Sequence, residues 1–399
     1  MLEPKSISRM AATFGVVAAT AGVAQQGEEI GIGVLLGFTG PIESLAAPMG
    51  TVVKLVTQEA TESGVFLGGA SVTSYLADTA CTDNALAVAS AERLLAAGVA
   101  GLIGGACSGA TAAVLKNVAI PNGMVMISPG ASSPNLSVME DKGLFFRTVA
   151  PDDREGQVMA DVLIDRGIRS IALTYANNDY GVGMSDAIVS AFEAAGGEVT
   201  INAAHEDGKA DYSADVAVLA AAGGEVLVVA GYIDQGGLGI VRTALDLGAF
   251  DTFGLPSTMV GQSLVESVGP GLEGSFGQVA GNESQGLAML AERAGDEVDG
   301  TLPYVAEVYD ATALMILAMQ AADSADPAHY GPKIWDVANA PGVKIFPGEL
   351  ARGLKLLAEG VEIDYVGGSE VELIGPGESA GSFREVEVRD GTFVTIGYR

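Results

Sequence analysis

Positive charge is scarce in this chain. Its 399 residues contain 20 Lys and Arg against 50 Asp and Glu, which gives a formal net charge of -30. Such an acidic surface repels phosphate backbones and anionic membranes, so nucleic acid is excluded as a partner. We interpret the excess as a solvated surface that keeps the protein soluble, and it says little about a ligand.

Cysteine and histidine are also rare, with two of each. In an exported chain the even pair Cys81 and Cys107 favours a disulfide over a metal site or a nucleophile, and two free buried thiols are the alternative. His205 and His329 lie far apart and lack ligand spacing, so we expect both in surface or loop positions and no metal site.

Motifs for catalysis and for phosphate binding are missing. There is no G-x-S-x-G elbow, and the first turn, GVLLGFTGPIES, has neither Lys nor the G-x-G-x-x-G spacing. We therefore expect a protein that is not an enzyme and needs no cofactor. An exported hydrolase or reductase is the remote alternative.

The N-terminus has the composition of a secretory signal peptide. Lys5 and Arg9 precede an uncharged run over 10–24, which contains the small residues Gly22 and Ala24 at cleavage spacing. Permanent anchoring is disfavoured because a spanning helix needs about 20 apolar residues, and an N-terminal core helix would lack bulk for packing. We expect residues 1–24 to be removed and the protein to be periplasmic.

The rest of the chain alternates between strand-like and helix-like segments. This order is typical of α/β units in which each helix returns the chain to a parallel strand. The expected strands are 30–36, 70–77, 101–103, 125–128, 170–175, 198–203, 226–230 and 252–255. The expected helices are 47–63, 84–97, 109–119, 153–166, 181–195, 212–222 and 236–247.

The length predicts two lobes, because single cores stop growing at about 250 to 300 residues. A break near 146–153 separates the lobes, a helix within 301–322 packs back on the first lobe, and a β-hairpin follows from Phe383 around Asp390-Gly391. We assign 28–149 plus 280–372 to the N-terminal lobe, and 150–279 plus 373–399 to the C-terminal lobe.

Loops that follow two expected strands are rich in Ser and Gly and have no nearby cation. Ligands of doubly wound sheets lie beyond the carboxyl ends of the strands. Ser108, in IGGACSGAT, offers a hydroxyl and amides to a ligand carboxylate, although a simple helix cap would use the same residue. In MISPGASSPNLS, residues 130–133 present main-chain groups and two hydroxyls, as an ordinary turn also would.

At these residues the chain resembles the periplasmic leucine/isoleucine/valine-binding proteins, the solute receptors of branched-chain amino acid ABC importers. The resemblance covers essentially the whole mature chain, and its order and spacing are more specific than any single motif. It implies a type I periplasmic binding fold, with two doubly wound parallel-sheet lobes joined by three hinge strands, and a Cys81–Cys107 disulfide. The segments that carry it are GVLLGFTGPIESLAAPMG, ADTACTDNALAVASAERLL, IGGACSGAT, MISPGASSPNL, FFRTVAPDD, YANNDYGVG, VVAGYIDQGGLGIVRTALDLGAF and GVEIDYVGGSEVEL.

The resemblance also implies roles for first-lobe residues. By position, Ser108 and Ser132 would bind the ligand carboxylate, and the Gly130 carbonyl would accept from the ligand amino group. Leu45 stands where family members often place an aromatic group, so its smaller bulk would reshape the pocket.

In the second lobe, Tyr180 and Tyr232 resemble the aromatic walls of the family, with core packing as the alternative. The family usually has an acidic residue where this chain has Ser257, and that carboxylate pairs with the ligand ammonium. A buried ammonium without a partner charge is costly, so Asp234 or Glu43 would have to compensate or the ligand would differ.

The sequence thus predicts an ABC importer receptor for a small amino-acid-like carboxylate, with membrane permease and ATPase subunits as partners. A ligand-sensing module for amides or small organic acids that signals to a partner is the alternative, and nothing in the chain separates the two.

Overall fold

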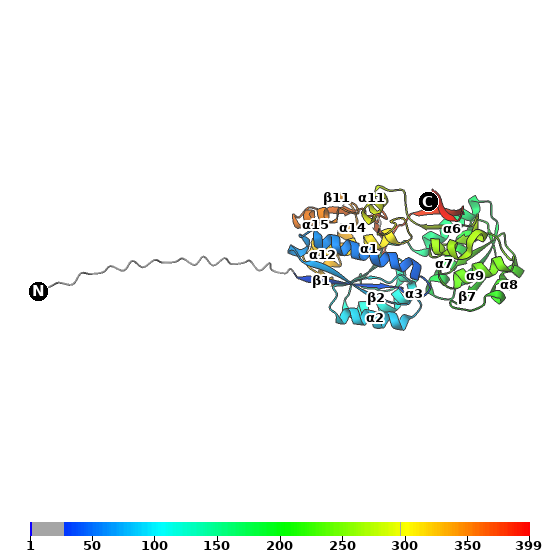
Figure 1. Ribbon diagram of the computed structural model, residues 1–399, viewed down its shortest axis with the longest axis horizontal. Helices are drawn as coiled ribbons and strands as arrows, with labels where there is room; N and C mark the ends of the chain where they lie inside the picture. Colours follow the sequence, from blue (N-terminus) through cyan, green and yellow to red (C-terminus); the bar gives the residue numbers. More distant parts are fainter. Residues whose placement is uncertain (2–27, 296) are drawn as a thin grey trace.

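The chain folds into two α/β lobes (Figure 1). The computed structural model describes Met1, residues 28–295 and residues 297–399. Apart from Met1, the signal peptide expected at 1–24 lies outside the described residues. In Figure 1 the blue and orange segments share one lobe, and the green segments form the other together with the red C-terminal strands. The first lobe is therefore discontinuous in sequence.

A seven-stranded sheet forms the centre of the first lobe, in the order β13-β14-β5-β4-β3-β1-β2. All neighbours pair in parallel except β13 and β14. Most of β1 is buried, as expected of a parallel strand covered on both faces. The strands are β1 (Glu29–Leu36), β2 (Ser71–Asp78), β3 (Gly101–Gly104), β4 (Met126–Ser128), β5 (Phe145–Arg147), β13 (Leu373–Ile374) and β14 (Glu378–Ser379).

Helices cover this sheet, and β11 (Val343–Ile345) pairs with β12 (Ile363–Tyr365) beside them. The longest are α1 (Glu43–Glu62) and α12 (Val305–Ala322), which pack against each other. By length and composition α12 could cross a membrane, but 89% of it is buried inside this lobe, so it is a core helix. The others are α2 (Asn84–Ala96), α3 (Ser108–Val114), α4 (Ile120–Asn122), α5 (Asn135–Val138), α11 (Gln285–Ala294), α13 (Pro327–Tyr330), α14 (Lys333–Ala338) and α15 (Leu350–Ala358).

The second lobe has a sheet of the same design, in the order β16-β15-β10-β9-β8-β6-β7. Five strands are parallel, and the C-terminal hairpin of β15 and β16 adds two antiparallel strands at one edge. The strands are β6 (Ser170–Ala176), β7 (Glu198–His205), β8 (Val226–Ala230), β9 (Phe253–Leu255), β10 (Phe276–Ala280), β15 (Phe383–Arg389) and β16 (Thr392–Tyr398). The helices are α6 (Asp152–Asp165), α7 (Asp179–Ala194), α8 (Ser213–Ala222), α9 (Gly236–Asp246), α10 (Gln262–Val268) and the 3₁₀ turns η3 (Ser257–Met259) and η4 (Gly269–Leu272).

Three segments connect the lobes, after β5, after β10 and after β14. The third crossing falls between Ser379 and Phe383, since β13 and β14 still belong to the first sheet. The sequence predicts that boundary at 372/373, which differs by several residues. The two-residue strands in LIGPGES carry too little β pattern to be recognised, which explains the difference.

The predicted elements up to residue 255, the late helix and the terminal hairpin are confirmed. The helix predicted over 109–119 is α3 continued by a π-helical turn, Leu115–Ala119. The Cys81–Cys107 disulfide is present and joins the start of the α2 segment to the residue before α3. The prediction for His205 was wrong: it is buried at the end of β7, where its Nδ1 lies 2.9 Å from the Thr174 hydroxyl.

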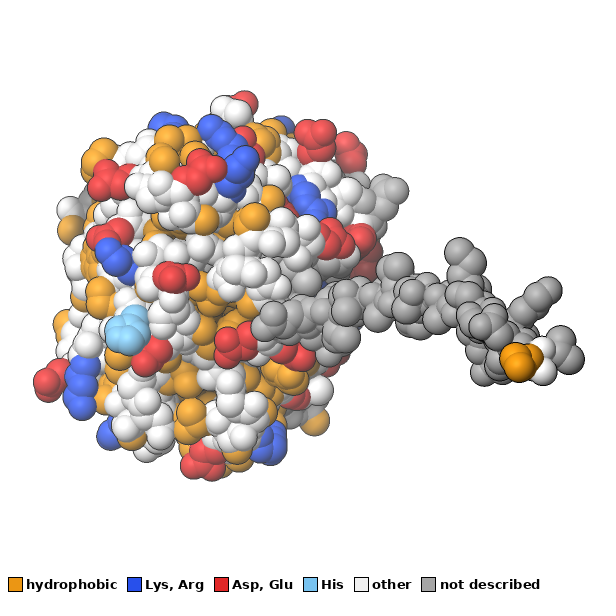
Figure 2. Space-filling view, turned by 90° about the vertical axis from the view of Figure 1, so that its left-hand side faces the viewer, with side chains coloured by type: hydrophobic (Ala, Val, Ile, Leu, Met, Phe, Trp, Pro, Cys, Tyr) orange, Lys and Arg blue, Asp and Glu red, His pale blue; other side chains and the backbone are white. Residues whose placement is uncertain are grey.

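Acidic and basic side chains are interspersed on the outer face of the first lobe in Figure 2, with apolar atoms between them. No group of three or more His, Cys, Asp or Glu residues in the described part of the chain could hold a metal ion.

Candidate ligand-binding site between the lobes

The two lobes meet at loops that follow the carboxyl ends of parallel strands. In the first sheet the strand order reverses at β1, which pairs with β2 on one side and with β3 on the other, up to Leu35 opposite Gly104. Crevices at such reversals are the usual ligand sites of doubly wound sheets. The loops after β1, β3 and β4 face those after β6, β8 and β9.

A small cavity lies between these loops. Its volume is about 10 Å³, measured as the space open to the centre of a water molecule. This is room for about one water. Both lobes line it, through Ile42, Leu45, Met49, Ala106, Cys107, Gly130, Tyr232, Thr258 and Tyr304. The lobes are therefore closed on each other.

Hydroxyls and main-chain groups make the first-lobe wall. Ser108 begins α3 and is buried, and its Oγ accepts from the Ser133 amide at 3.1 Å. The Ser128 hydroxyl accepts from the Ala131 amide at 2.9 Å and donates to the Gly105 carbonyl at 2.7 Å. These bonds tie the two loops after β3 and β4 into one surface.

The buried Arg147 supports this wall from behind. Its Nη1 donates to the Ala131 and Ser133 carbonyls at 3.3 and 3.1 Å, and its Nη2 pairs with Glu378 at 2.5 Å. Because the guanidinium is hydrogen-bonded to two loop carbonyls and ion-paired with Glu378, it stabilises the loop that follows β4.

Aromatic rings make the second-lobe wall. Asn178 caps α7 by accepting from the Gly181 amide at 3.0 Å, which places Tyr180 in the first helical turn. The rings of Tyr180 and Tyr232 stack at a centroid distance of 5.3 Å, and the Tyr180 hydroxyl lies 2.6 Å from the Thr258 hydroxyl. The wall is thus a rigid pair of rings.

Tyr304, just before α12, adds a second ring to the cavity lining, after Tyr232. Its φ of 65° lies in the left-handed region, which is costly for a residue with a Cβ and is found at functional sites. Burial raises the pKa values of Tyr180, Tyr232 and Tyr304 well above the ordinary value, so all three phenols are neutral.

Two carboxyl groups lie one turn apart at the start of α6, beside the aromatic wall. The Glu155 Oε1 accepts from the Ser257 amide at 2.7 Å, from the Ser257 hydroxyl at 2.8 Å and from Gln278 Nε2 at 3.2 Å. Burial raises the pKa of Glu155 to about 7, against the opposing effect of these hydrogen bonds.

Asp152 is fully buried, and neither of its oxygens has a hydrogen-bond partner. Burial raises its pKa well above the usual range, and the nearby Glu155 charge raises it further. The Ser132 hydroxyl, which acts in the opposite direction, approaches Asp152 without reaching hydrogen-bond geometry. Asp152 therefore favours its neutral form.

The sequence offers Asp234 and Glu43 as carboxylates that could replace the missing charge at Ser257. The structure places both in other surroundings. The Asp234 Oδ2 accepts from the amide and the hydroxyl of Ser44 at 2.9 and 2.7 Å, and its amide donates to the Pro41 carbonyl at 3.1 Å. Asp234 thus links the second lobe to the start of α1. Glu43 is exposed.

The structure brings the predicted site residues together. Leu45, Gly130 and Tyr232 line the cavity, and Ser108, Ser132, Tyr180 and Ser257 are buried directly behind or beside the lining. Sequence reasoning missed Asp152, Glu155, Thr258 and Tyr304. The acidic run after Pro151 was a visible signal for the first two, but no local pattern pointed to Tyr304.

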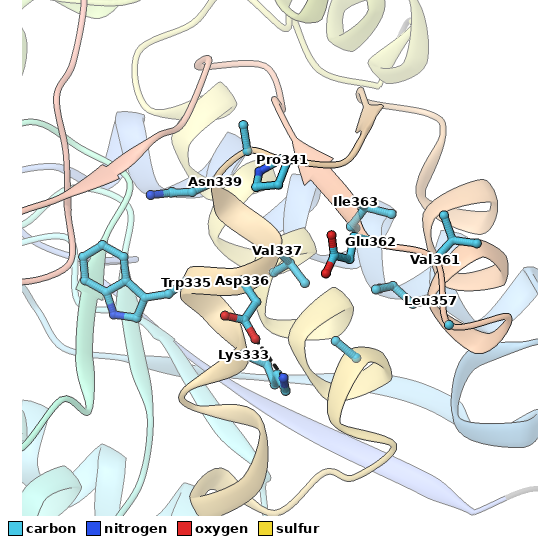
Figure 3. A pocket seen from close by; sticks show the side chains of 13 residues that line it. Lys333, Trp335, Asp336, Val337, Asn339, Pro341, Leu357, Val361, Glu362 and Ile363 are labelled. Carbon is cyan, nitrogen blue, oxygen red and sulfur yellow. Dashed lines mark hydrogen bonds and ion pairs between the residues drawn. The ribbon is translucent and has the colours of Figure 1, made fainter.

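A larger cavity, of about 560 Å³, lies elsewhere, on the first lobe between α14, α15 and β12. Figure 3 shows Trp335 and the pair Lys333–Asp336 at its edge. That pair is exposed and its two members bond to each other at 2.8 Å, and the buried residues Val337 and Ile363 of the lining are apolar.

Residues 29–333 match the profile of the periplasmic binding protein family. The leucine-, isoleucine-, valine-, threonine- and alanine-binding protein of Pseudomonas aeruginosa is 24% identical over 301 residues, 74% of this chain and 80% of that protein. The Leu/Ile/Val-binding protein homolog 1 of Brucella melitensis is 28% identical over 304 residues, 74% of this chain and 79% of that protein.

Solved structures show the same fold. The leucine-binding protein LivK of Thermotoga maritima superposes with a TM-score of 0.76 at 21% identity, covering 92% of this chain and 98% of that chain. A solute-binding protein of R. palustris in complex with 4-hydroxybenzoate superposes with a TM-score of 0.74 at 18% identity, covering 93% of this chain and 97% of that chain. With its two doubly wound lobes and the cavity between them, this chain belongs to the periplasmic binding protein family.

Proposed function

We propose that this protein is the extracytoplasmic solute receptor of an ABC importer and binds a small amino-acid-like carboxylate between its lobes. One observation carries the proposal: loops from both lobes close one cavity, with hydroxyls and amides on one side and stacked tyrosines on the other. The relatives named for leucine, isoleucine and valine favour a branched-chain amino acid as the ligand.

The ligand carboxylate would lie against the first-lobe wall. The hydroxyls of Ser108 and Ser132 would donate to it, and the Gly130 carbonyl would accept from the amino group. Leu45 and Tyr232, both in the cavity lining, would contact the side chain. Tyr180 would hold the ring of Tyr232 by stacking.

Binding would require the lobes to move. A cavity of about 10 Å³ admits about one water and no amino acid. The ligand would therefore enter an open form, and rotation about the three crossing segments would close the lobes on it. A ligand favours closure only through contacts that it makes better in the closed form. We assign these contacts to Tyr180, Tyr232 and the Ser257 loop of the second lobe.

The closed form would then dock on the membrane permease of the importer, whose ATPase drives uptake. This assigns the protein a periplasmic location, reached through the signal peptide expected at 1–24. It also makes the protein a binding protein that releases its ligand unchanged.

The test is a thermal-shift screen of amino acids, their desamino analogues and aromatic carboxylates, since a ligand that binds only the native state raises its melting temperature. Calorimetry of each hit should give one site per chain, and Tyr232→Ala should reduce the shift strongly, as expected for about 100-fold weaker binding. If no compound shifts the melting temperature, or if hits are indifferent to Tyr232→Ala, the cleft is not the binding site.

A further inference from the structure

A ligand with an amino group needs a negative charge in the closed cleft. An ammonium ion taken out of water without a partner charge costs several kcal/mol. Glu43, Asp152, Glu155 and Asp234 are four of the carboxyl groups near the cleft, and Asp179, Asp207 and Glu307 also lie near enough to Tyr232 or Tyr304 to raise their pKa values. Two of them are unsuitable, because Glu43 is exposed and Asp234 already accepts two hydrogen bonds from Ser44 at the edge of the interface.

Glu155 has the surroundings of an ionisable partner. All three of its hydrogen bonds go to Oε1, from the amide and hydroxyl of Ser257 and from Gln278, and Oε2 accepts none within the described residues. Donors aimed at a carboxylate favour its charged form. The residue is nearly buried, at 3% exposure, and no Lys, Arg or His of the described chain forms an ion pair with it.

Glu155 is also close to the cavity. Ser257, which it holds, is followed by Thr258, a lining residue whose hydroxyl meets that of Tyr180. Tyr304, another lining residue, is near enough for the Glu155 charge to raise its pKa. A charge at Glu155 therefore acts on two tyrosines at the cavity, Tyr180 and Tyr304.

Asp152 does not compete for this role. It is fully buried and its oxygens have no hydrogen-bond partner, so its neutral form is favoured, and a charged Glu155 reinforces that preference. The pair then carries one negative charge in total, which matches one ammonium group. A neutral Asp152 next to Ser132 also leaves the proposed carboxylate position free of repulsion.

We propose that Glu155, oriented by Ser257, supplies the charge that pairs with the amino group of the ligand. The assignment selects ligands that carry both a carboxylate and an ammonium group over carboxylic acids of the same shape. It rests on the proposed function, because it takes the cavity as the binding site. Ser257 stands where the family usually has an acidic residue. Here its amide and hydroxyl orient the carboxylate of Glu155, which comes from α6.

The assignment has a pH consequence. In the empty protein the pKa of Glu155 is about 7, and an ammonium ligand binds the ionised form, so affinity should rise with pH up to about that value. The groups facing Glu155 are Asp152 on its own helix, Tyr180 of α7, Tyr304 before α12, and the neutral donors Ser257 and Gln278. The tyrosines stay neutral and Asp152 favours its neutral form, so Glu155 is the group among these whose ionisation sets the pH dependence.

The experiment compares leucine with isocaproate, the same acid without its amino group, by calorimetry on the full chain. Glu155→Gln should weaken leucine binding at pH 8 by about 20-fold or more, as expected for loss of a charged hydrogen bond. Its isocaproate affinity should stay within about threefold of the wild type, which also shows that the cleft is intact. Wild-type leucine affinity should rise about tenfold from pH 6 to pH 8, and that of the variant should stay flat.

Asp153→Asn, an exposed neighbour on the same helical turn, is the matched control and should leave both affinities unchanged. Glu155→Asp keeps the charge, and Glu155→Gln combined with Ser257→Glu moves it to the loop; each should recover part of the leucine affinity. Unchanged leucine binding in Glu155→Gln, or an equal loss for both acids, would overturn the role of Glu155 alone. If the wild type binds neither acid nor any other compound of the screen, the proposed function itself fails.

Discussion

The two walls of the cleft differ in chemistry although both lobes share one fold. The first-lobe wall, around Ser108 and residues 130–133, has hydroxyls and amides without a free charge, because the buried Arg147 is occupied by loop carbonyls and Glu378. The second-lobe wall has neutral tyrosines and, beside them, two buried carboxyl groups. Each wall thus suits a different end of one zwitterion.

This contrast also suggests an order of events. In the proposed site a ligand carboxylate would be held by hydroxyls and amides that the first lobe fixes among its own residues, so the first lobe would capture ligand in the open form. Glu155 belongs to the second lobe, so its charge would reach the ligand only on closure. Predictions that alter one wall at a time can break or sharpen this comparison.

The largest expected effect concerns stability and pH. A carboxyl whose pKa is raised by folding contributes stability below its unfolded pKa, and that stability is lost as pH rises through the folded pKa. For Glu155 the change from 4.5 to about 7 corresponds to about 3 kcal/mol, lost between those pH values.

Glu155→Gln has no charge to bury, so its stability relative to the wild type should rise by about 3 kcal/mol between pH 4.5 and pH 8. Denaturant unfolding at both pH values, without ligand, measures this difference. Asp153→Asn provides the reference. A constant difference across that range would mean that Glu155 keeps an ordinary pKa in the folded protein.

Removing a ring from the second wall should come next. Tyr232→Ala deletes a lining side chain and the partner of Tyr180, and should weaken leucine binding by about 100-fold, because buried aromatic anchors dominate binding energy. Tyr398→Ala, at a tyrosine with 47% exposure on the far hairpin, is the control. Calorimetry that finds less than about a threefold loss would remove the rings from the site.

A first-wall change should be milder and indifferent to the amino group. Ser108→Ala removes one hydroxyl donor and should cost about 2 kcal/mol of binding free energy for leucine and isocaproate alike. Ser267→Ala, an exposed serine of α10, is the matched control. Unchanged affinity for both acids would show that Ser108 only caps its helix and holds Ser133.

The smallest effect should come from the edge of the interface. Asp234→Ala removes the contacts to Ser44 that only the closed form makes, so all ligands should dissociate about fivefold faster, with little change in association. Stopped-flow kinetics can separate the two rates, with the exposed Asp246→Ala as control. Faster dissociation of leucine alone would instead place Asp234 beside the amino group.

The fold was predictable because its signals are local. The buried run of β1, the cap at Asn178 and the turn at Asp390-Gly391 each act within a few residues. The loops of the site could also be located, since parallel strands all end at one edge of their sheet.

The partners within the site could not be predicted. Glu155 meets Ser257 across 102 residues, and Tyr304 reaches the cavity from a segment of the first lobe far from its other loops. Such pairings arise only when two sheets and three crossings are assembled. The same limit explains β13 and β14, whose short pairing depends on the edge that β5 offers.

The structure of the complex with the amino acid that gives the largest thermal shift tests the account most directly. We expect its carboxylate at hydrogen-bond distance from Ser108 and Ser132, its amino group facing Glu155, and its side chain against Leu45 and Tyr232. A ligand in the groove beside Trp335, or one turned so that its carboxylate faces the tyrosine wall, would contradict the account.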